Sequence, residues 1–209
     1  GAMFLTEKAG GSDVGQVATI AKGGTGVPGE RVTLWGDKWF CSNADADVIM
    51  ILARPEGAGP GTKGLGLYVL PRTLENGKRN GYRIDRIKDK LGERSFPTGE
   101  VTLEGAEAFL LGGPGQGFHQ MAEMLNLSRL YNAIASVAVM RRSVTEAIDW
   151  AQQRLAFGKK IIEQSVWEQR IGEARTNIEM TRLLCLKAAD MMDKVGNKAA
   201  QTEIAMIKV

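Results

Sequence analysis

The stretch Phe4-Leu5-Thr6-Glu7-Lys8-Ala9-Gly10-Gly11-Ser12-Asp13 joins the end of an apolar strand to a glycine-rich turn. Glycine lacks a Cβ and adopts φ > 0, so the backbone can approach another group closely here. Thr6, Ser12 and the backbone amides freed by the turn can donate hydrogen bonds to an anionic or heteroaromatic ligand. A plain structural loop explains the same pattern equally well. The rest of the chain therefore has to decide between a loop and a ligand-binding turn.

Short strands separated by glycine-rich turns account for the sequence up to about Gly117. The runs between the turns are rich in β-branched, aromatic and other large apolar residues, which favour strands. They are Val32–Trp35, Asp47–Leu52, Gly66–Leu70 and Glu100–Leu103. Glycine clusters at 57–61 and 112–117 punctuate this part of the chain. Several short strands at this spacing predict a β-barrel or a β-sandwich.

The sequence changes to a helical period after Phe118, where glycine becomes scarce. Residues 118–155 are apolar nearly all round in their middle part, which predicts a helix buried between neighbours. A second long helix is indicated by one apolar seam with alternating spacings of three and four, and Gly196 stands where a C-cap would end it. The seam consists of Ile171, Ala174, Ile178, Thr181, Cys185, Ala188, Met192 and Val195. A further helix is expected from Lys198 to Val209, where the chain looks cut within the element.

An α+β fold in two parts follows from this change of period. Residues 1–114 are expected to form a β-barrel or sandwich domain. Residues 115–209 are expected to form the start of a helical bundle domain, with a connector near residues 112–117.

The composition is that of an ordinary globular protein, with 44% hydrophobic and 24% charged residues. No segment approaches the roughly 18 consecutive apolar residues of a membrane span, and a cytoplasmic location is the default expectation. Cys41 and Cys185 lie far apart, and His119 is the single histidine, so neither a disulfide framework nor a metal site is expected. The net charge of +3 fits phosphate-rich cofactors or nucleic acid and demonstrates neither.

Two polar patterns leave alternatives open. Ser128, Asn132 and Ser136 form a narrow polar strip on the first long helix, which indicates either helix–helix hydrogen bonds or the wall of a polar ligand cavity. A basic stretch could bind DNA, but acidic residues interleave it and favour a solvated, charged strand pair. Its cations are Lys78, Arg79, Arg83, Arg86, Lys88, Lys90 and Arg94, and its anions are Asp85, Asp89 and Glu93.

Two further motifs give the opening turn a family context. Asp37-Lys38-Trp39-Phe40-Cys41-Ser42-Asn43 and Arg154-Leu155-Ala156-Phe157-Gly158-Lys159 follow it in the order found in the acyl-CoA dehydrogenases, which use FAD. The sequence resembles that family and, within it, the alkylation-response (AidB-like) branch, to which residues 86–95 are also similar. Lys8 stands where most of the family has proline. The resemblance implies a fragment with the middle β-domain and part of a four-helix bundle. The first three residues, Gly1-Ala2-Met3, are either native or left from an expression tag.

The resemblance implies an FAD site in the first half of the chain. Leu5 and Thr6 would face the pyrimidine edge of the isoalloxazine, and Trp39 would pack against the ring. Cys41 aligns with a position near flavin N5, but a thiol is a weak donor, so Ser42 is the alternative for that hydrogen bond. A buried core position is the structural alternative for both Trp39 and Cys41. The remaining cofactor assignments in this half are Met3, Gly11 and Ser12.

The resemblance also implies contacts from the second half. Arg154 would bind FAD pyrophosphate and Phe157 would lie by the adenosine part, in the FAD of a neighbouring subunit. This implies a homo-oligomer, either a dimer or a tetramer. The alternative for Arg154 is a cation beside the negative end of a helix dipole.

The substrate implied by the family is an acyl-CoA thioester, contacted by Ser12, Asn126 and Arg129. Some members carry the catalytic glutamate where Ser128 stands, and others carry it in a region that corresponds to sequence beyond Val209. Glu123 and Glu146 fall at neither position, so no residue here is assigned as catalytic. The leading expectation is FAD-dependent α,β-dehydrogenation by the full-length protein, with an electron-accepting flavoprotein as a possible partner. The alternatives are an AidB-like DNA-binding stress flavoprotein with little dehydrogenase activity and a purely structural or assembly module.

Overall fold

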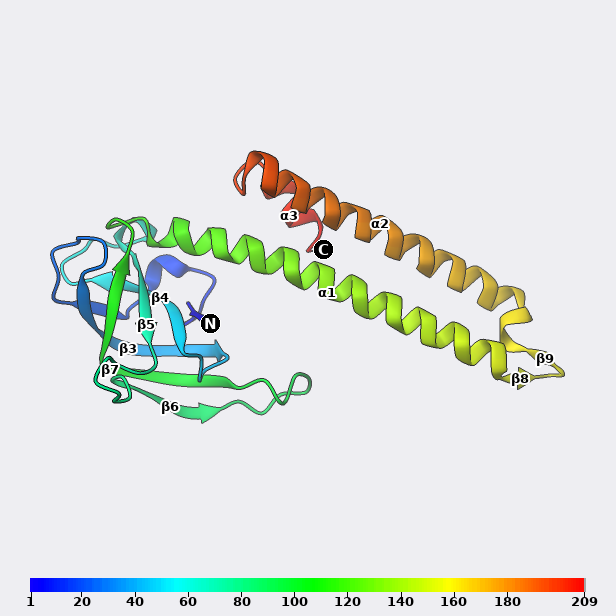
Figure 1. Ribbon diagram of the computed structural model, residues 1–209, viewed down its shortest axis with the longest axis horizontal. Helices are drawn as coiled ribbons and strands as arrows, with labels where there is room; N and C mark the ends of the chain where they lie inside the picture. The colour runs from blue at the N-terminus through cyan, green and yellow to red at the C-terminus, as the bar shows by residue number, and fades with distance from the viewer. Residues whose placement is uncertain (209) are drawn as a thin grey trace. The chain divides into compact units, whose positions relative to one another are not determined.

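The computed structural model describes residues 1–208, and these form two units, each with its own core (Figure 1). The first unit is Gly1–Ala122 and the second begins at Glu123. Helix α1, Gly117–Gln153, starts in the first unit and continues into the second.

The first unit is built on a seven-stranded sheet within residues 1–122. Its strands are β1 (Ala2–Phe4), β2 (Ile20–Lys22), β3 (Arg31–Ser42), β4 (Val48–Pro55), β5 (Gly66–Pro71), β6 (Tyr82–Ile87) and β7 (Thr98–Leu111). The pairings run from β4 through β2, β3, β7 and β5 and return to β4, which closes a barrel. Strand β1 pairs with β4 in parallel, and β6 pairs with β7 antiparallel. Of the predicted barrel and sandwich, the barrel is the fold that forms. The four predicted strands fall on β3, β4, β5 and β7, with Asp47 one residue before β4.

Alternation of inward and outward side chains builds the barrel core. Leu34 and Ile51 are 0% exposed, and Tyr68 and Leu103 are no more than 2% exposed. These side chains come from four different strands, so a single apolar cluster ties the barrel together.

Loops and short 3-10 turns complete the first unit. The turns η1 (Val14–Gln16) and η2 (Thr62–Gly64) are joined through Arg54, whose guanidinium donates to Gly15 O at 2.8 Å and to Gly61 O at 3.2 Å. A Cβ at Gly117 would collide with the β5 backbone at Gly66 and Leu67, so glycine is required where α1 begins.

The second unit is a helical hairpin with a short third helix. After α1 come strands β8 (Leu155–Ala156) and β9 (Lys159–Lys160), the turn η3 (Ile161–Glu163), and helices α2 (Ser165–Val195) and α3 (Gln201–Met206). Ile178, Cys185 and Ala188 of α2 are buried, as the predicted seam requires. Gly196 ends α2 with φ of 83°, which confirms the expected C-cap. Val195 is a correction to the seam, because its side chain is 57% exposed at the last turn.

Helix α1 is covered on one side only within the second unit. Leu130, Ala133 and Val137 pack in the cluster that holds the α2 seam and Ile207. Tyr131 and Val139 are each 65% exposed. The expectation of a helix buried between neighbours is therefore only partly met, because α2 and α3 cover a single apolar face.

Across residues 1–208, no helix is long and apolar enough to cross a membrane. The same residues contain no group of three or more side chains that could hold a metal ion.

Candidate functional site

The glycine-rich turn folds back on its own threonine. Glu7 and Gly10 exchange backbone hydrogen bonds of 3.2 and 2.9 Å across the tight turn between them. A Cβ built at Gly11 would lie 2.5 Å from Thr6 Oγ1, so the chain passes directly over the Thr6 side chain. The glycines therefore let the backbone pass close to the Thr6 side chain of the same turn. The Thr6 side chain is still partly exposed to solvent.

Strand β3 fixes this turn through two consecutive residues. The Trp39 amide donates to Thr6 O at 2.7 Å. The preceding residue, Lys38, has a fully buried side chain whose ammonium donates to Glu7 Oε1 at 2.8 Å and to Leu5 O at 3.4 Å. Leu5, Thr6 and Glu7 are therefore all held from β3, although they lie more than thirty positions away in the sequence.

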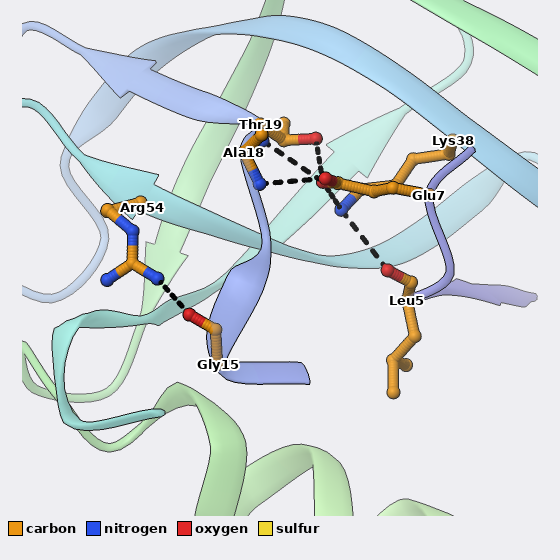
Figure 2. A network of polar contacts seen from close by, with 7 residues as sticks. All are labelled: Leu5, Glu7, Gly15, Ala18, Thr19, Lys38 and Arg54. Carbon is orange, nitrogen blue, oxygen red and sulfur yellow. Dashed lines mark hydrogen bonds and ion pairs between the residues drawn. The ribbon is translucent and has the colours of Figure 1, made fainter. Parts of the chain in front are cut away.

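The Glu7 carboxylate collects the other donors of this network, as Figure 2 shows. It accepts the Ala18 amide at 2.7 Å, the Thr19 amide at 3.0 Å and the Thr19 hydroxyl at 2.6 Å. Burial by itself would raise the pKa of Glu7, but the Lys38 ammonium and these donors together hold that pKa below its usual range. Burial lowers the pKa of Lys38, and the charge of Glu7 opposes the shift. The 2.8 Å contact between the two side chains makes Glu7 and Lys38 a buried ion pair.

A β-bulge directly follows Lys38 and changes which side chains face outward. The register between β3 and β7 shifts between Lys38 and Cys41, so one extra residue is accommodated in β3. Phe40 sits in this bulge with φ of 59°, a left-handed conformation that is uncommon for an aromatic residue. Its ring is 59% exposed. Sequence reasoning missed Phe40, and the only available signal was the Trp-Phe pair itself, because the bulge cannot be read from strand alternation.

The bulge corrects the assignment of Cys41. Cys41 is 0% exposed and belongs to the barrel core, where burial raises the pKa of its thiol to about 12. A buried thiol cannot reach a ligand outside the barrel, so the core alternative holds for this residue. Ser42, the next residue, is exposed and remains available for the hydrogen bond.

The Trp39 side chain is partly buried and lies next to the ammonium groups of two lysines. The Lys88 ammonium lies 3.8 Å from the centre of a Trp39 ring and 4.4 Å from that of Phe40, within cation–π range. Lys8, at the position where most of the family has proline, lies 5.7 Å from the indole. One face of Trp39 is therefore occupied by lysine, and Phe40 is the more accessible ring.

The basic stretch around β6 is largely neutralised within the first unit. Five of its cations form ion pairs with carboxylates at 2.5–3.2 Å. They are Arg79 with Asp45, Arg83 with Asp85 and Glu104, Arg86 and Lys88 with Glu100, and Arg94 with Asp89. The expected solvated, charged strand pair is met in part, because only Tyr82–Ile87 of this stretch forms a strand, β6, which pairs with β7.

The Arg-x-x-Phe-Gly motif forms a tight hairpin between β8 and β9. Phe157 and Gly158 have φ of 53° and 78°, so both central residues adopt the positive φ of a two-residue turn. The Phe157 side chain is fully exposed at the tip, and Arg154 is exposed at the base. Within residues 1–208, Arg154 forms no ion pair with a carboxylate. Both side chains are thus open to a partner molecule, and the helix-dipole alternative for Arg154 remains open.

The polar strip of α1 borders a groove between α1 and α2. Asn132 and Ser136 line it together with Arg129 and Thr181, around a volume of about 430 Å³. Ser136 Oγ donates to Asn132 O at 2.9 Å within its own helix, which is not a helix–helix hydrogen bond. The cavity-wall alternative is therefore favoured for these two residues.

The remaining sequence-predicted residues fall on both units. Met3, Leu5 and Gly11 are partly exposed, and Ser12 is exposed, in the first unit. In the second unit Arg129 donates to Asn126 Oδ1 at 2.9 Å on the same helix. Glu146 is paired with Arg142 at 2.7 Å, and both side chains are exposed on α1.

Comparison with known proteins identifies the two units. Residues 2–106 match the acyl-CoA dehydrogenase middle domain, and residues 115–209 match the C-terminal domain of the same family. The chain belongs to the acyl-CoA dehydrogenase family. Homologues in this family are FAD flavoproteins.

Two curated relatives and one solved structure illustrate the similarity. The chain is 34% identical over 212 residues to acyl-CoA dehydrogenase family member 11 of Caenorhabditis elegans, covering 99% of this chain and 34% of that protein. It is 35% identical over 192 residues to the putative acyl-CoA dehydrogenase AidB of Escherichia coli, covering 92% of this chain and 34% of that protein. The structure of Caenorhabditis elegans ACDH-11 in complex with C11-CoA superimposes with a TM-score of 0.85 at 34% identity, covering 99% of this chain and 35% of that one. Since both curated relatives are about equally similar, the AidB-like branch is not uniquely favoured.

The chain spans about a third of the length of these relatives. The acyl-CoA dehydrogenase middle domain in this chain presents groups that fit a flat heteroaromatic ring. The exposed Phe40 ring offers an apolar face, Ser42 offers a hydroxyl donor two residues further along β3, and Thr6 offers another on the turn whose carbonyl accepts the Trp39 amide. The residues present therefore fit the isoalloxazine of FAD.

Proposed function

We propose that the full-length protein containing this chain is an FAD-dependent acyl-CoA dehydrogenase. The observation that carries this proposal is the aromatic bulge at Phe40, which is exposed beside a turn that the buried Lys38–Glu7 pair holds in place. When bound, FAD would supply the hydride acceptor for α,β-dehydrogenation of a thioester. The residues of this chain bind and orient the cofactor and do not supply the catalytic base.

The first unit would hold the isoalloxazine. Phe40 would pack on the ring system, in the role that the sequence assigned to Trp39, because its ring is the more accessible of the two. The Thr6 hydroxyl and the Ser42 hydroxyl would donate hydrogen bonds to the polar edge of the ring. Trp39 would support Phe40 from behind, since the two rings are in edge contact with centroids 6.3 Å apart.

The second unit would contact the other end of an FAD molecule. An exposed arginine at the base of the β8–β9 hairpin suits a pyrophosphate, and the exposed Phe157 ring suits the adenosine part. In this proposal the FAD belongs to a neighbouring subunit, so the protein is a dimer or a tetramer. The Phe157 side chain is fully exposed within residues 1–208, so its ring is accessible to such a contact.

The proposed substrate class is an acyl-CoA thioester. Support comes from the Caenorhabditis elegans relative, whose structure is a complex with C11-CoA. Arg129 and Asn126 on α1, and Ser12 in the first unit, are the residues that we propose for the CoA part.

An AidB-like, DNA-binding flavoprotein is the second candidate, favoured by 35% identity to the Escherichia coli protein. Ion pairing argues against the basic stretch as its DNA surface, because five of seven cations already have carboxylate partners. Exposed ion pairs of this kind gain little from a further phosphate.

Anaerobic addition of a panel of acyl-CoAs to the FAD-loaded, full-length protein tests the proposal. Dehydrogenation would bleach the visible absorption of the flavin, and Ser128→Ala should bleach at a similar rate because serine cannot abstract an α-proton. Absence of bleaching with every acyl-CoA, together with DNA binding that weakens steeply with salt, would establish the AidB-like candidate instead. Loss of bleaching in Ser128→Ala alone would show that this residue takes part in the reaction.

A further inference from the structure

Lys38 is a completely buried cation with no assigned part in the chemistry of the site. Its side chain is 0% exposed, and its ammonium reaches the backbone of Leu5 and the carboxylate of Glu7. Replacing such a buried ion pair by well-packed apolar residues is often neutral or stabilising. Stability alone therefore does not explain why a lysine occupies this position.

The contacts of Lys38 point instead to orientation. Its ammonium holds Leu5 and Glu7, which flank Thr6, while the amide of the next residue, Trp39, holds Thr6 O at 2.7 Å. Two neighbouring residues of β3 thus fix three consecutive residues of the turn. The bulge that exposes Phe40 starts at the same place, so the same residues set both sides of the candidate ring site.

Glu7 extends the connection to a third segment. Its carboxylate accepts the Ala18 and Thr19 amides and the Thr19 hydroxyl, just before β2. Figure 2 shows these groups converging on one carboxylate from separate parts of the barrel. An apolar pair of the same volume could fill this space, but it could not fix the direction of the Leu5 carbonyl or of the turn that follows.

We propose that Lys38 is a positioning residue, whose buried ammonium holds the Leu5–Glu7 turn against β3 so that Thr6 keeps its backbone contact with Trp39, the neighbour of the exposed Phe40. The proposal rests on the flavin site described under Proposed function. Lys38 acts through the turn and touches neither cofactor nor substrate in this scheme.

The test compares the full-length wild type with the double variant Lys38→Met/Glu7→Leu, which leaves no unpaired buried charge. Hydrogen exchange of the Trp39 amide is measured in protein without FAD, and the FAD dissociation constant is measured by titration. The proposal predicts that Trp39 exchange accelerates and that the dissociation constant rises, each at least about tenfold. Lys22→Met, which removes an exposed lysine 5.5 Å from the Trp35 ring, should change neither quantity.

Wild-type exchange and wild-type FAD affinity in a folded double variant would overturn the proposal. Faster exchange with unchanged FAD affinity would also overturn it, because the turn would then be free without consequence for the ligand. If wild type binds no FAD but exchange accelerates in the double variant, the attachment of the turn stands and the flavin assignment fails. If the double variant does not fold, Thr19→Val takes its place, because it keeps the ion pair and removes only the 2.6 Å hydrogen bond from the Thr19 hydroxyl to Glu7. In Thr19→Val the exchange rate of the Trp39 amide and the FAD dissociation constant should each rise a few-fold.

Discussion

Replacing Glu7 by glutamine should destabilise the first unit strongly. The substitution keeps the size of the side chain but removes the carboxylate that lies 2.8 Å from the Lys38 ammonium. The Lys38 side chain is 0% exposed, so its charge stays buried without a partner of opposite charge. Removing one partner of a buried pair costs about 3–5 kcal/mol, which is a large part of the roughly 5–15 kcal/mol that stabilises a typical domain. Glutamine has a single side-chain oxygen, whereas the Ala18 and Thr19 amides donate to different oxygens of the Glu7 carboxylate, so one of these amides also loses its acceptor. The loss therefore reports on the unpaired ammonium together with one unsatisfied amide.

Urea denaturation followed by tryptophan fluorescence measures this loss. The matched control is Glu107→Gln, since Glu107 pairs at 3.0 Å with an Arg31 whose side chain is 70% exposed. Such a surface pair contributes about 0–1 kcal/mol. The reasoning is refuted if Glu7→Gln costs no more than Glu107→Gln, or if adding Lys38→Met to Glu7→Gln restores none of the lost stability.

The same ion pair predicts the direction of the pH dependence. The pKa of Glu7 lies below its ordinary value of 4.5 in the folded protein, so the unfolded chain binds this proton first as the pH falls. The contribution of Glu7 is therefore fully present above about pH 4.5 and is lost as the pH falls through the lower, folded-state pKa. The difference in unfolding free energy between wild type and Glu7→Gln should shrink in that window.

Three further predictions concern other parts of the chain. Cys41, whose pKa burial raises to about 12, should resist alkylation at mildly alkaline pH until the protein unfolds, and rapid labelling of the native protein would show that the barrel core is open. Arg154→Ala should weaken FAD binding roughly tenfold and make it depend on protein concentration, whereas Arg142→Ala, which removes a surface ion pair with Glu146, should do neither. DNA binding, measured by fluorescence anisotropy, should be weak at physiological salt. Arg83→Ala should not alter the DNA affinity, because Arg83 is already paired with Asp85 and Glu104. A clear loss of DNA affinity in this variant would contradict the pairing argument.

Local pattern was sufficient to predict four of the seven strands of the sheet and both long helices. Strands β3, β4, β5 and β7 contain β-branched and aromatic runs bounded by turn residues. The α2 seam follows the spacing of one helix face, and Gly196 marks its end. The exposed half of α1 could not be foreseen, because an all-round apolar helix indicates burial without saying which segment covers it.

The arrangement of the site depended on information that the sequence pattern lacks. The bulge after Lys38 moves Cys41 into the core and Phe40 outward, and no residue type specifies where a strand takes an extra residue. Lys38 itself looks like a surface cation in the sequence, and only the non-local partner Glu7 explains its burial. The family motifs indicated the segments, and the structure shows which side chains within them are accessible.

Titration of the FAD-free, full-length protein with FAD tests the central claim, namely that the β3 bulge and the Leu5–Glu7 turn form the flavin site. The account predicts one FAD per chain and a dissociation constant that rises at least about tenfold in Phe40→Ala, equivalent to about 1.4 kcal/mol. Phe109→Ala, which removes a 36% exposed ring from β7 away from the turn, should bind FAD like wild type. Wild-type affinity in Phe40→Ala, or no FAD binding by the wild-type protein, would contradict the account.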